Sequence, residues 1–340
     1  MKAQHTGTST SGGPLSFPLD LLGQLLFSPV VCIVLGITVA VVVVVIRRTA
    51  GSASGPVASK PRRERIAIAG VALAAGLSWI TDIALRGSVF DMSATVSWWR
   101  FAVAPTAAAA GLTALAVVMR AEAPRRVVDS ATAGRRTWTT FGPRRGIPVF
   151  LVLAGVAVAV TLVFGDMSTA SDPGLAAHVA LELPNTDAPP VVLPFPGWAY
   201  GIPLIVSVSA LAAILVLVLG RNALRPFPAG VPLDVERGRR AMVARDATAL
   251  ATAATLLATA GALRLARSAV VTTVTTMTGS GTGPAQSVNL PHADLIMVGG
   301  AIAPVAEIVG CALLALLVVG GARAARAPLG RTVAWTGVSG

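Results

Sequence analysis

Seven stretches of this chain are almost entirely apolar, and polar segments separate them. The stretches cover residues 22–46, 66–85, 101–119, 147–165, 198–220, 247–265 and 294–319. Each is close to or above the roughly 20 helical residues that cross the hydrocarbon core of a bilayer. Because every backbone N–H and C=O must be satisfied inside lipid, helices are the expected spanning form. The pattern therefore predicts an all-α, polytopic transmembrane helix bundle with seven spans, the sixth of them rich in Ala and Thr rather than Leu and Ile.

The composition agrees with a membrane protein. Hydrophobic residues make up 54% of the chain and charged residues 12%, and this charged fraction is about half that of a typical soluble protein. Residues 1–16 are rich in Ser, Thr and Gly, which predicts a disordered N-terminal tail. Residues 17–321 are assigned to the transmembrane domain and residues 322–340 to a C-terminal tail.

The basic residues fall on alternate connections between the apolar stretches. All but five of the 27 Lys and Arg residues follow the first, third, fifth or seventh stretch. The five exceptions are Lys2, Arg86, Arg100, Arg264 and Arg267. The positive-inside rule then predicts a multi-pass protein of the plasma membrane, with the N-terminus outside and the C-terminus in the cytoplasm. Since topology accounts for the net charge of +12, lipid is the expected partner and nucleic acid is not.

Two of the predicted outer connections, residues 166–197 and 267–293, are long. Partial alternation over residues 177–183 predicts a short strand, and the β-branched run over residues 270–276 is a second candidate. One interpretation pairs these two segments into a small extracytoplasmic cap. The other leaves both connections as irregular loops on the bundle.

Ionisable residues inside the spans are candidates for function, because burying them in a membrane is costly. Glu307 lies near the middle of the seventh stretch, three residues after Pro304. It either takes or passes a proton or cation, or it forms a polar contact between helices. Asp82 and Arg264 lie near the predicted outer ends of their spans. They form a candidate ion pair, with Arg86 as another partner for Asp82, or they reach toward the membrane interface.

A second candidate site lies in the outer loops, where His178, Glu182, His292 and Asp294 carry groups that bind divalent cations. Their spacing matches no known ligand motif, and the other interpretation is four solvated side chains. We therefore expect no tightly bound metal and no cofactor. Cys32 and Cys311 both fall inside apolar stretches, which predicts buried, free thiols.

Signatures of enzymes are absent from the sequence: it contains no G-x-S-x-G, H-E-x-x-H, Walker A or C-x-x-C motif. The predicted cytoplasmic connections are too short to fold into a nucleotide-binding domain. The leading hypothesis is a transport-class membrane subunit, or an accessory of an exporter, whose ATP would be hydrolysed by a separate ATPase chain. The alternative is a non-transporting membrane scaffold or sensor that partners a cytoplasmic regulator.

One local resemblance accompanies these patterns. Residues 194–203 read P-F-P-G-W-A-Y-G-I-P and follow an acidic outer connection. This stretch of about ten residues resembles a recurrent feature of uncharacterised actinobacterial multi-pass membrane proteins, and the Ala-, Val- and Arg-rich, Lys-poor composition is similar to theirs. The resemblance implies a multi-pass membrane protein and carries no activity or site residue.

Overall fold

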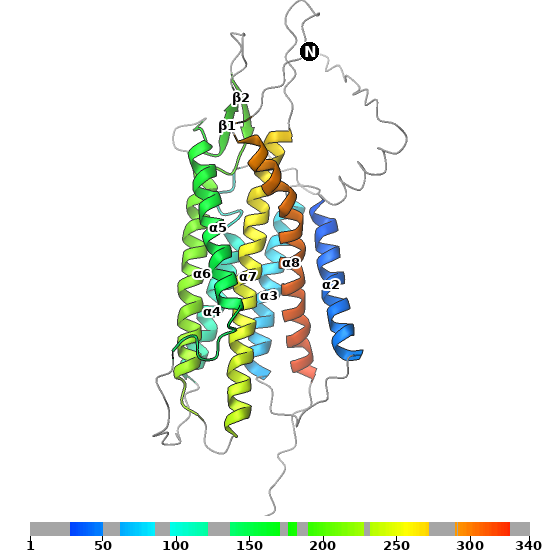
Figure 1. Ribbon diagram of the computed structural model, residues 1–340, viewed down its shortest axis with the longest axis vertical. Helices are drawn as coiled ribbons and strands as arrows, with labels where there is room; N and C mark the ends of the chain where they lie inside the picture. Colours follow the sequence, from blue (N-terminus) through cyan, green and yellow to red (C-terminus); the bar gives the residue numbers. More distant parts are fainter. Residues whose placement is uncertain are drawn as a thin grey trace, which may run out of the picture.

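The computed structural model describes residues 28–49, 62–85, 96–121, 137–170, 176–181, 190–227, 232–271, 290 and 292–326. Within these ranges, seven helices are long and apolar enough to cross a membrane. They run side by side as one bundle (Figure 1) and confirm the predicted all-α architecture. The helices are α2 (Pro29–Thr49), α3 (Arg62–Ala84), α4 (Val103–Ala121), α5 (Gly146–Met167), α6 (Trp198–Leu224), α7 (Leu233–Val271) and α8 (Ala293–Arg326). The predicted tail over residues 1–16 lies outside the described residues.

The largest differences from the predicted boundaries are in α7 and α8. Helix α7 begins at Leu233 rather than at residue 247, and α8 ends at Arg326 rather than at residue 319. The extra turns of α7 are polar, but Glu236 and Arg240 in them are buried and paired. A hydropathy profile measures the transfer of apolar side chains into lipid. It does not detect these polar turns, because packing and ion pairing stabilise them.

The helix ends divide the bundle into two chemically different ends. Apart from Arg100, Arg264 and Arg267, the arginines that the structure describes lie at or near one end, called here the basic end. The opposite end carries a small β-hairpin and is called the hairpin end (Figure 1). The alternation of charge along the sequence therefore corresponds to a separation of charge in space.

Helix α7 is the most enclosed of the spans, with 61% of its apolar window buried. It contacts α3, α4, α5, α6 and α8. Its Ala-rich sequence suits this position, because small side chains let neighbouring helices approach closely inside a membrane. The hydroxyls of Thr248, Thr252, Thr255 and Thr259 donate to backbone carbonyls one turn earlier, so none is left unsatisfied. The Ala and Thr content that set this span apart is thus a consequence of its central position.

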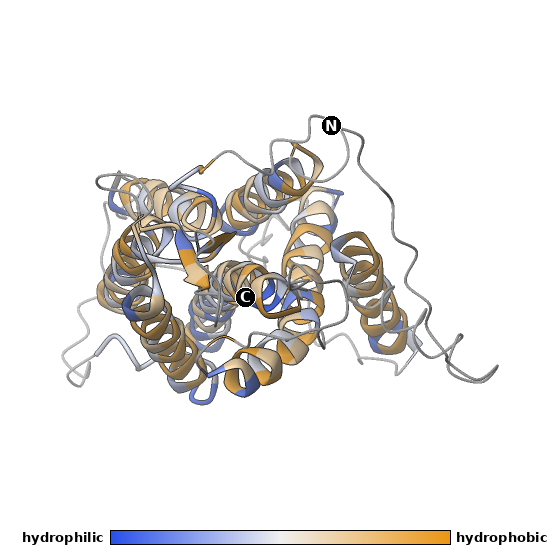
Figure 2. Ribbon diagram, turned by 90° about the horizontal axis from the view of Figure 1, so that it is seen from above, coloured by the Kyte–Doolittle hydropathy of each residue, from blue (hydrophilic) through white to orange (hydrophobic). Residues whose placement is uncertain are grey.

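Large apolar side chains cover the outside of the bundle. On α5 alone, Val149, Leu151, Val152 and Val156 are exposed, and hydrophobic residues dominate the helices in the view along the bundle (Figure 2). A soluble monomer rarely exposes apolar surface on this scale. The protein is therefore an integral, multi-pass membrane protein whose perimeter faces lipid.

Helix α2 lies at the edge of the bundle and packs mainly on α8. A glycine permits this contact: a Cβ atom at Gly36 would lie 2.6 Å from Cβ of Cys311 and 2.8 Å from the carbonyl oxygen of Ile308. Any larger residue at this position would push the two helices apart. This close approach fixes the depth at which Cys32, one turn earlier in α2, meets α8.

The hairpin consists of β1 (His178–Leu181) and β2 (Val191–Pro194), which pair antiparallel with His178 opposite Pro194. The predicted first strand is confirmed, and its partner in the structure is β2, not the segment over residues 270–276 that one of the two interpretations gave it. Val270 and Val271 belong to the end of α7, and residues 272–276 lie outside the described residues. Strand β1 pairs instead within its own connection, where a local hairpin closes a shorter loop.

Candidate functional site

The most unusual polar group in the apolar part of the bundle is Glu307 on α8, whose side chain is fully buried. Arg264 on α7 approaches it, and Arg264 Nε donates to Glu307 Oε2 at 2.7 Å. The Nη2 atom of Arg264 donates to the same oxygen. The carboxylate predicted as a candidate site thus faces the interior of the bundle and has a cationic partner on a neighbouring helix.

Two further side chains complete this polar cluster, which comprises Glu307, Arg264, Cys32 and Trp79. Arg264 Nη2 lies 3.0 Å from Cys32 Sγ on α2, and the indole of Trp79 on α3 lies beside the carboxylate. Among the described residues, neither Glu307 Oε1 nor Trp79 Nε1 has a partner with hydrogen-bond geometry, although both atoms are buried. Glu307 Oε1 can therefore accept a proton or a water, with the Trp79 indole beside the carboxylate.

Local packing explains why these side chains meet. A Cβ atom at Gly261 of α7 would lie 2.6 Å from the Trp79 ring, so only glycine leaves room for the indole at this level. Pro304 lies inside α8 one turn before Glu307, and the upper turns of α8 slant relative to the rest of the helix (Figure 1). Proline removes a backbone hydrogen bond and permits such a bend. Pro203 likewise lies inside α6, whereas Pro29 begins α2 and Pro105 lies in the first turn of α4.

The cluster lies nearer the hairpin end than the basic end. At about 1.5 Å per residue, Glu307 is roughly 24 Å from Arg323 along α8, and Cys32 is roughly 22 Å from Arg47 along α2. The hydrocarbon core is about 30 Å thick. Both estimates place the cluster in the membrane half toward the hairpin end, although Glu307 is near the middle of its own helix.

The predicted ion pair between Asp82 and Arg264 involves different partners in the structure. Asp82 on α3 lies 3.4 Å from Nε of Arg100, in the segment before α4, while Arg264 meets Glu307. Arg86, the other predicted partner of Asp82, lies outside the described residues. Arg267 follows Arg264 by one turn, and its aliphatic stem lies against Gly300 of α8. The two arginines therefore face α8 at successive levels.

The predicted outer-loop site is not assembled within the described residues. His178 is a partly exposed residue of β1, His292 and Asp294 are exposed at the start of α8, and Glu182 lies outside the described residues. His292 has a positive φ of 57° at the turn into α8. No group of three or more His, Cys, Asp or Glu side chains in the described part of the chain is arranged to hold a metal ion.

Sequence reasoning missed an ion-pair network at the basic end, where acidic residues meet some of the many arginines. Glu64 of α3 pairs with Arg225 and Arg239. Asp246 pairs with Arg65 at 3.1 Å. These contacts join α3 to the end of α6 and to α7. The sequence offered one signal, which was the presence of carboxylates among segments otherwise dominated by arginine.

A separate ion pair at this end involves Arg240, which has 1% of its surface exposed. Its guanidinium bonds to Glu236 Oε1 at 2.9 Å and to the carbonyl oxygens of Ala223 and Pro226, and it lies over the ring of Phe227. In the sequence, Arg240 is only one of many basic residues. In the structure it has a specific role, because its hydrogen bonds hold the end of α6 to the start of α7.

Chemically, the polar cluster combines a buried carboxylate with a fixed cation across two helices. Such a pair is stable only while both charges are present, because loss of either one leaves the other without compensation. The cluster can therefore respond to a proton or to a competing ion by changing the contact between α7 and α8.

Neither a protein-family model, nor a curated protein, nor a solved structure matches the chain.

Proposed function

We propose that this protein is a transport-class membrane subunit, or an accessory of an exporter, in which the Arg264–Glu307 pair responds to a proton or cation. The observation that carries the proposal is the fully buried Glu307, bonded to Arg264 through one oxygen while its other oxygen has no partner among the described residues. Ionisable groups inside membranes are costly and commonly mark ion or substrate pathways.

Because Glu307 Oε1 has no hydrogen-bond partner among the described residues, it can accept a proton, which gives the pair a second state with a neutral Glu307. A proton bound at Oε1 would neutralise Glu307, so that Arg264 would donate to a neutral carboxyl oxygen in place of a carboxylate. The attraction that holds α8 to α7 at this level would then weaken. Because Pro304 lies only one turn away, the upper turns of α8 are the segment we expect to move.

A cytoplasmic partner fits the proposed orientation, in which the basic end faces the cytoplasm. Helix α7 has 39 residues and is therefore about 58 Å long, against a hydrocarbon core of about 30 Å. Its polar first turns extend past the neighbouring helices at the basic end (Figure 1). Arg240 fixes this extension to α6, which makes it a rigid surface for a separate ATPase chain.

The same extension supports the second candidate function, a non-transporting scaffold or sensor with a cytoplasmic regulator. In that case Arg264 and Glu307 act as a permanent fastener between α7 and α8. The two functions differ in whether Glu307 must titrate. Ion flux through the membrane therefore distinguishes them.

The test uses the full chain in liposomes that contain the pH dye pyranine, with a potassium gradient and valinomycin to drive protons inward. We expect the wild-type protein to acidify the lumen faster than empty liposomes do. Glu307→Gln keeps the size and hydrogen bonding of the side chain but removes the titrating carboxylate, so we expect its flux to fall to the level of empty liposomes.

Asp82→Asn is the matched control, because it removes a carboxylate from a different ion pair, and we expect it to retain most of the flux. Equal flux for wild type, Glu307→Gln and Glu307→Leu would contradict a transport role for Glu307. A wild-type protein that conducts no more than empty liposomes would favour the scaffold or sensor.

A further inference from the structure

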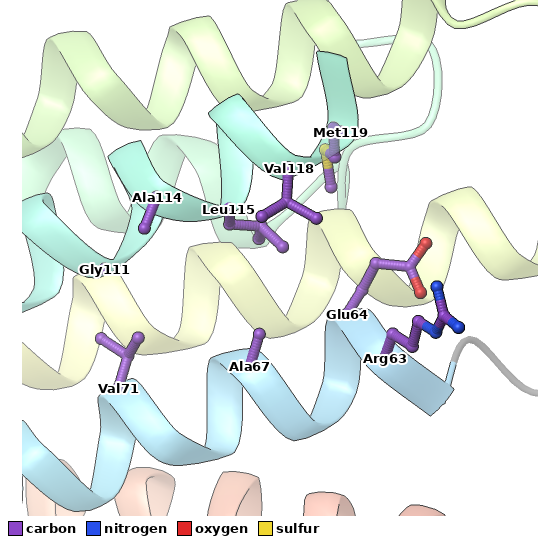
Figure 3. Close-up of a pocket in the computed structure, with 9 residues that line it drawn as sticks. All are labelled: Arg63, Glu64, Ala67, Val71, Gly111, Ala114, Leu115, Val118 and Met119. Atoms are coloured by element: carbon purple, nitrogen blue, oxygen red, sulfur yellow. The ribbon is translucent and has the colours of Figure 1, made fainter. Parts of the chain in front are cut away.

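A groove unrelated to the polar cluster runs between α3 and α4 toward the basic end. It encloses about 140 Å³. Side chains of α3 and α4 face each other along it, and the two charged members stand at one end (Figure 3). The lining residues are Arg63, Glu64, Ala67, Val71, Gly111, Ala114, Leu115, Val118 and Met119.

The groove opens to the perimeter of the bundle. Its rim residues Ala67, Ala114 and Val118 are exposed, while Leu115 and Met119 are buried beneath it. From Val71 to Arg63 the groove follows α3 for about 12 Å. Because the perimeter faces lipid and the floor is apolar, an acyl chain lying parallel to the helices matches both its shape and its chemistry.

The charged end of the groove carries an unsatisfied acceptor. Glu64 has only 4% of its surface exposed, and its Oε1 accepts from Arg239 at 2.5 Å and from Arg225 at 3.4 Å. Its Oε2 is buried and has no hydrogen-bond partner in the described part of the chain. A buried carboxylate oxygen without a donor is costly, so this end of the groove suits a ligand that brings an O–H or N–H group.

The charge balance at this end favours an anion as the rest of the ligand. Among the described side chains at this end, the carboxylate of Glu64 stands near the guanidinium groups of Arg63, Arg225 and Arg239, so these side chains together carry a net positive charge. Arginine is well suited to bind phosphate. The ligand should therefore combine an apolar chain, a phosphate and a hydrogen-bond donor beyond the phosphate.

We propose that this groove binds one anionic phospholipid with a hydroxyl-bearing headgroup, taken from the leaflet at the basic end. Its acyl chain lies along Ala67, Ala114 and Val118, and its phosphate meets Arg63. A headgroup hydroxyl donates to Glu64 Oε2. The proposal needs neither the transport function nor a particular orientation of the protein in the membrane.

The test is native mass spectrometry of the full chain in detergent, titrated with three lipids that have identical acyl chains. Phosphatidylglycerol has the charge and the hydroxyls, phosphatidylmethanol has the charge alone, and phosphatidylcholine has neither. We expect one phosphatidylglycerol retained per chain, weaker retention of phosphatidylmethanol and the weakest retention of phosphatidylcholine. Equal retention of all three lipids would overturn the site, and equal retention of the two anionic lipids would overturn the contact with Glu64.

Two variants locate the lipid within the bundle. Ala114→Leu fills the groove from its exposed rim, and we expect it to abolish the one-to-one complex. Arg63→Gln should weaken phosphatidylglycerol binding about fivefold, the change expected when one arginine near an anionic lipid is lost. Ala110→Leu adds the same volume to an exposed position of α4 outside the groove and should bind as wild type does. If Ala114→Leu, folded as judged by a monodisperse gel-filtration profile, binds like Ala110→Leu, the groove is not the binding site.

Discussion

Arg264 and Glu307 compensate each other's charge, and this changes the interpretation of a carboxylate in an apolar stretch. An isolated Glu307 would be expected to stay neutral, because a lone charge in hydrocarbon is expensive. The structure instead surrounds it with a guanidinium, a thiol and an indole from neighbouring helices. The energetic unit is therefore the pair, and each residue should be judged by what its loss does to the other.

The pair predicts a strongly non-additive mutational cycle. Glu307→Leu and Arg264→Leu each leave one buried charge without its partner, so each should lower the free energy of unfolding by about 3–5 kcal/mol. The double variant replaces both charges by apolar groups and should recover most of that loss. Thermal unfolding of the purified proteins in detergent measures all members of the cycle, and simple addition of the two single losses would show that the side chains do not depend on each other.

Sequence alone identified Glu307 but not the residues around it. The cost of a carboxylate in an apolar stretch is a local property, and it can be seen without a structure. The partner Arg264 is 43 residues away, and its place near the same predicted interface as Asp82 makes it a candidate partner of that residue instead, or a side chain that reaches toward the interface. The sequence predicts a buried thiol at Cys32 but gives no sign that Cys32 or Trp79 lies beside Glu307, because that depends on which faces of α2, α3, α7 and α8 meet.

At the scale of elements, hydropathy predicted where helices cross the membrane better than it predicted where they end. The polar turns at the start of α7 are stabilised by Glu236, Arg240 and Asn222, and contacts of this kind leave no trace in a hydropathy profile. The hairpin shows the same limit. Alternation predicted β1, but the choice between partners depended on loop closure, which placed Val191–Pro194 beside it.

The stretch at residues 194–203 has a structural explanation in the turn from β2 into α6. Phe195 is fully buried and meets the ring of Phe164 edge to face. A Cβ atom at Gly197 would lie 2.2 Å from the carbonyl oxygen of Ala176, so the hairpin can lie on the end of the bundle only if this residue is glycine. The aromatic and glycine residues of this stretch thus form the joint between the hairpin and the helices.

The central position of α7 predicts that it tolerates added volume poorly. Ala258 is fully buried, and Ala258→Leu would force the surrounding helices apart, at a cost of about 1–3 kcal/mol in the free energy of unfolding. Ala301→Leu is the matched control, because Ala301 is exposed on α8 and should change stability by less than about 0.5 kcal/mol. Denaturation of both variants in the same detergent tests the packing, and equal stability of the two would contradict a tightly packed α7.

At the scale of the whole molecule, the bundle separates its charges along the membrane normal. The described carboxylates at the basic end include Glu64, Glu236 and Asp246, each paired with an arginine. Many arginines of this end therefore remain to interact with water and lipid phosphates. The large number of arginines at this end follows from the topology. The few that pair with carboxylates hold α3, α6 and α7 together, and only the three-dimensional arrangement shows which arginines these are.

This separation of charge predicts the orientation of the protein. Arginine-rich connections are retained in the cytoplasm during insertion, so the basic end should face the cytoplasm and the hairpin should face outside. A C-terminal fusion to green fluorescent protein should fluoresce, and a C-terminal fusion to alkaline phosphatase should be inactive. A phosphatase inserted after Pro194, at the end of β2, should be active and provides the positive control within the same chain. An active phosphatase at the C-terminus together with an inactive one after Pro194 would show the opposite orientation. The extension of α7 would then lie outside the cell, where no cytoplasmic ATPase or regulator could reach it.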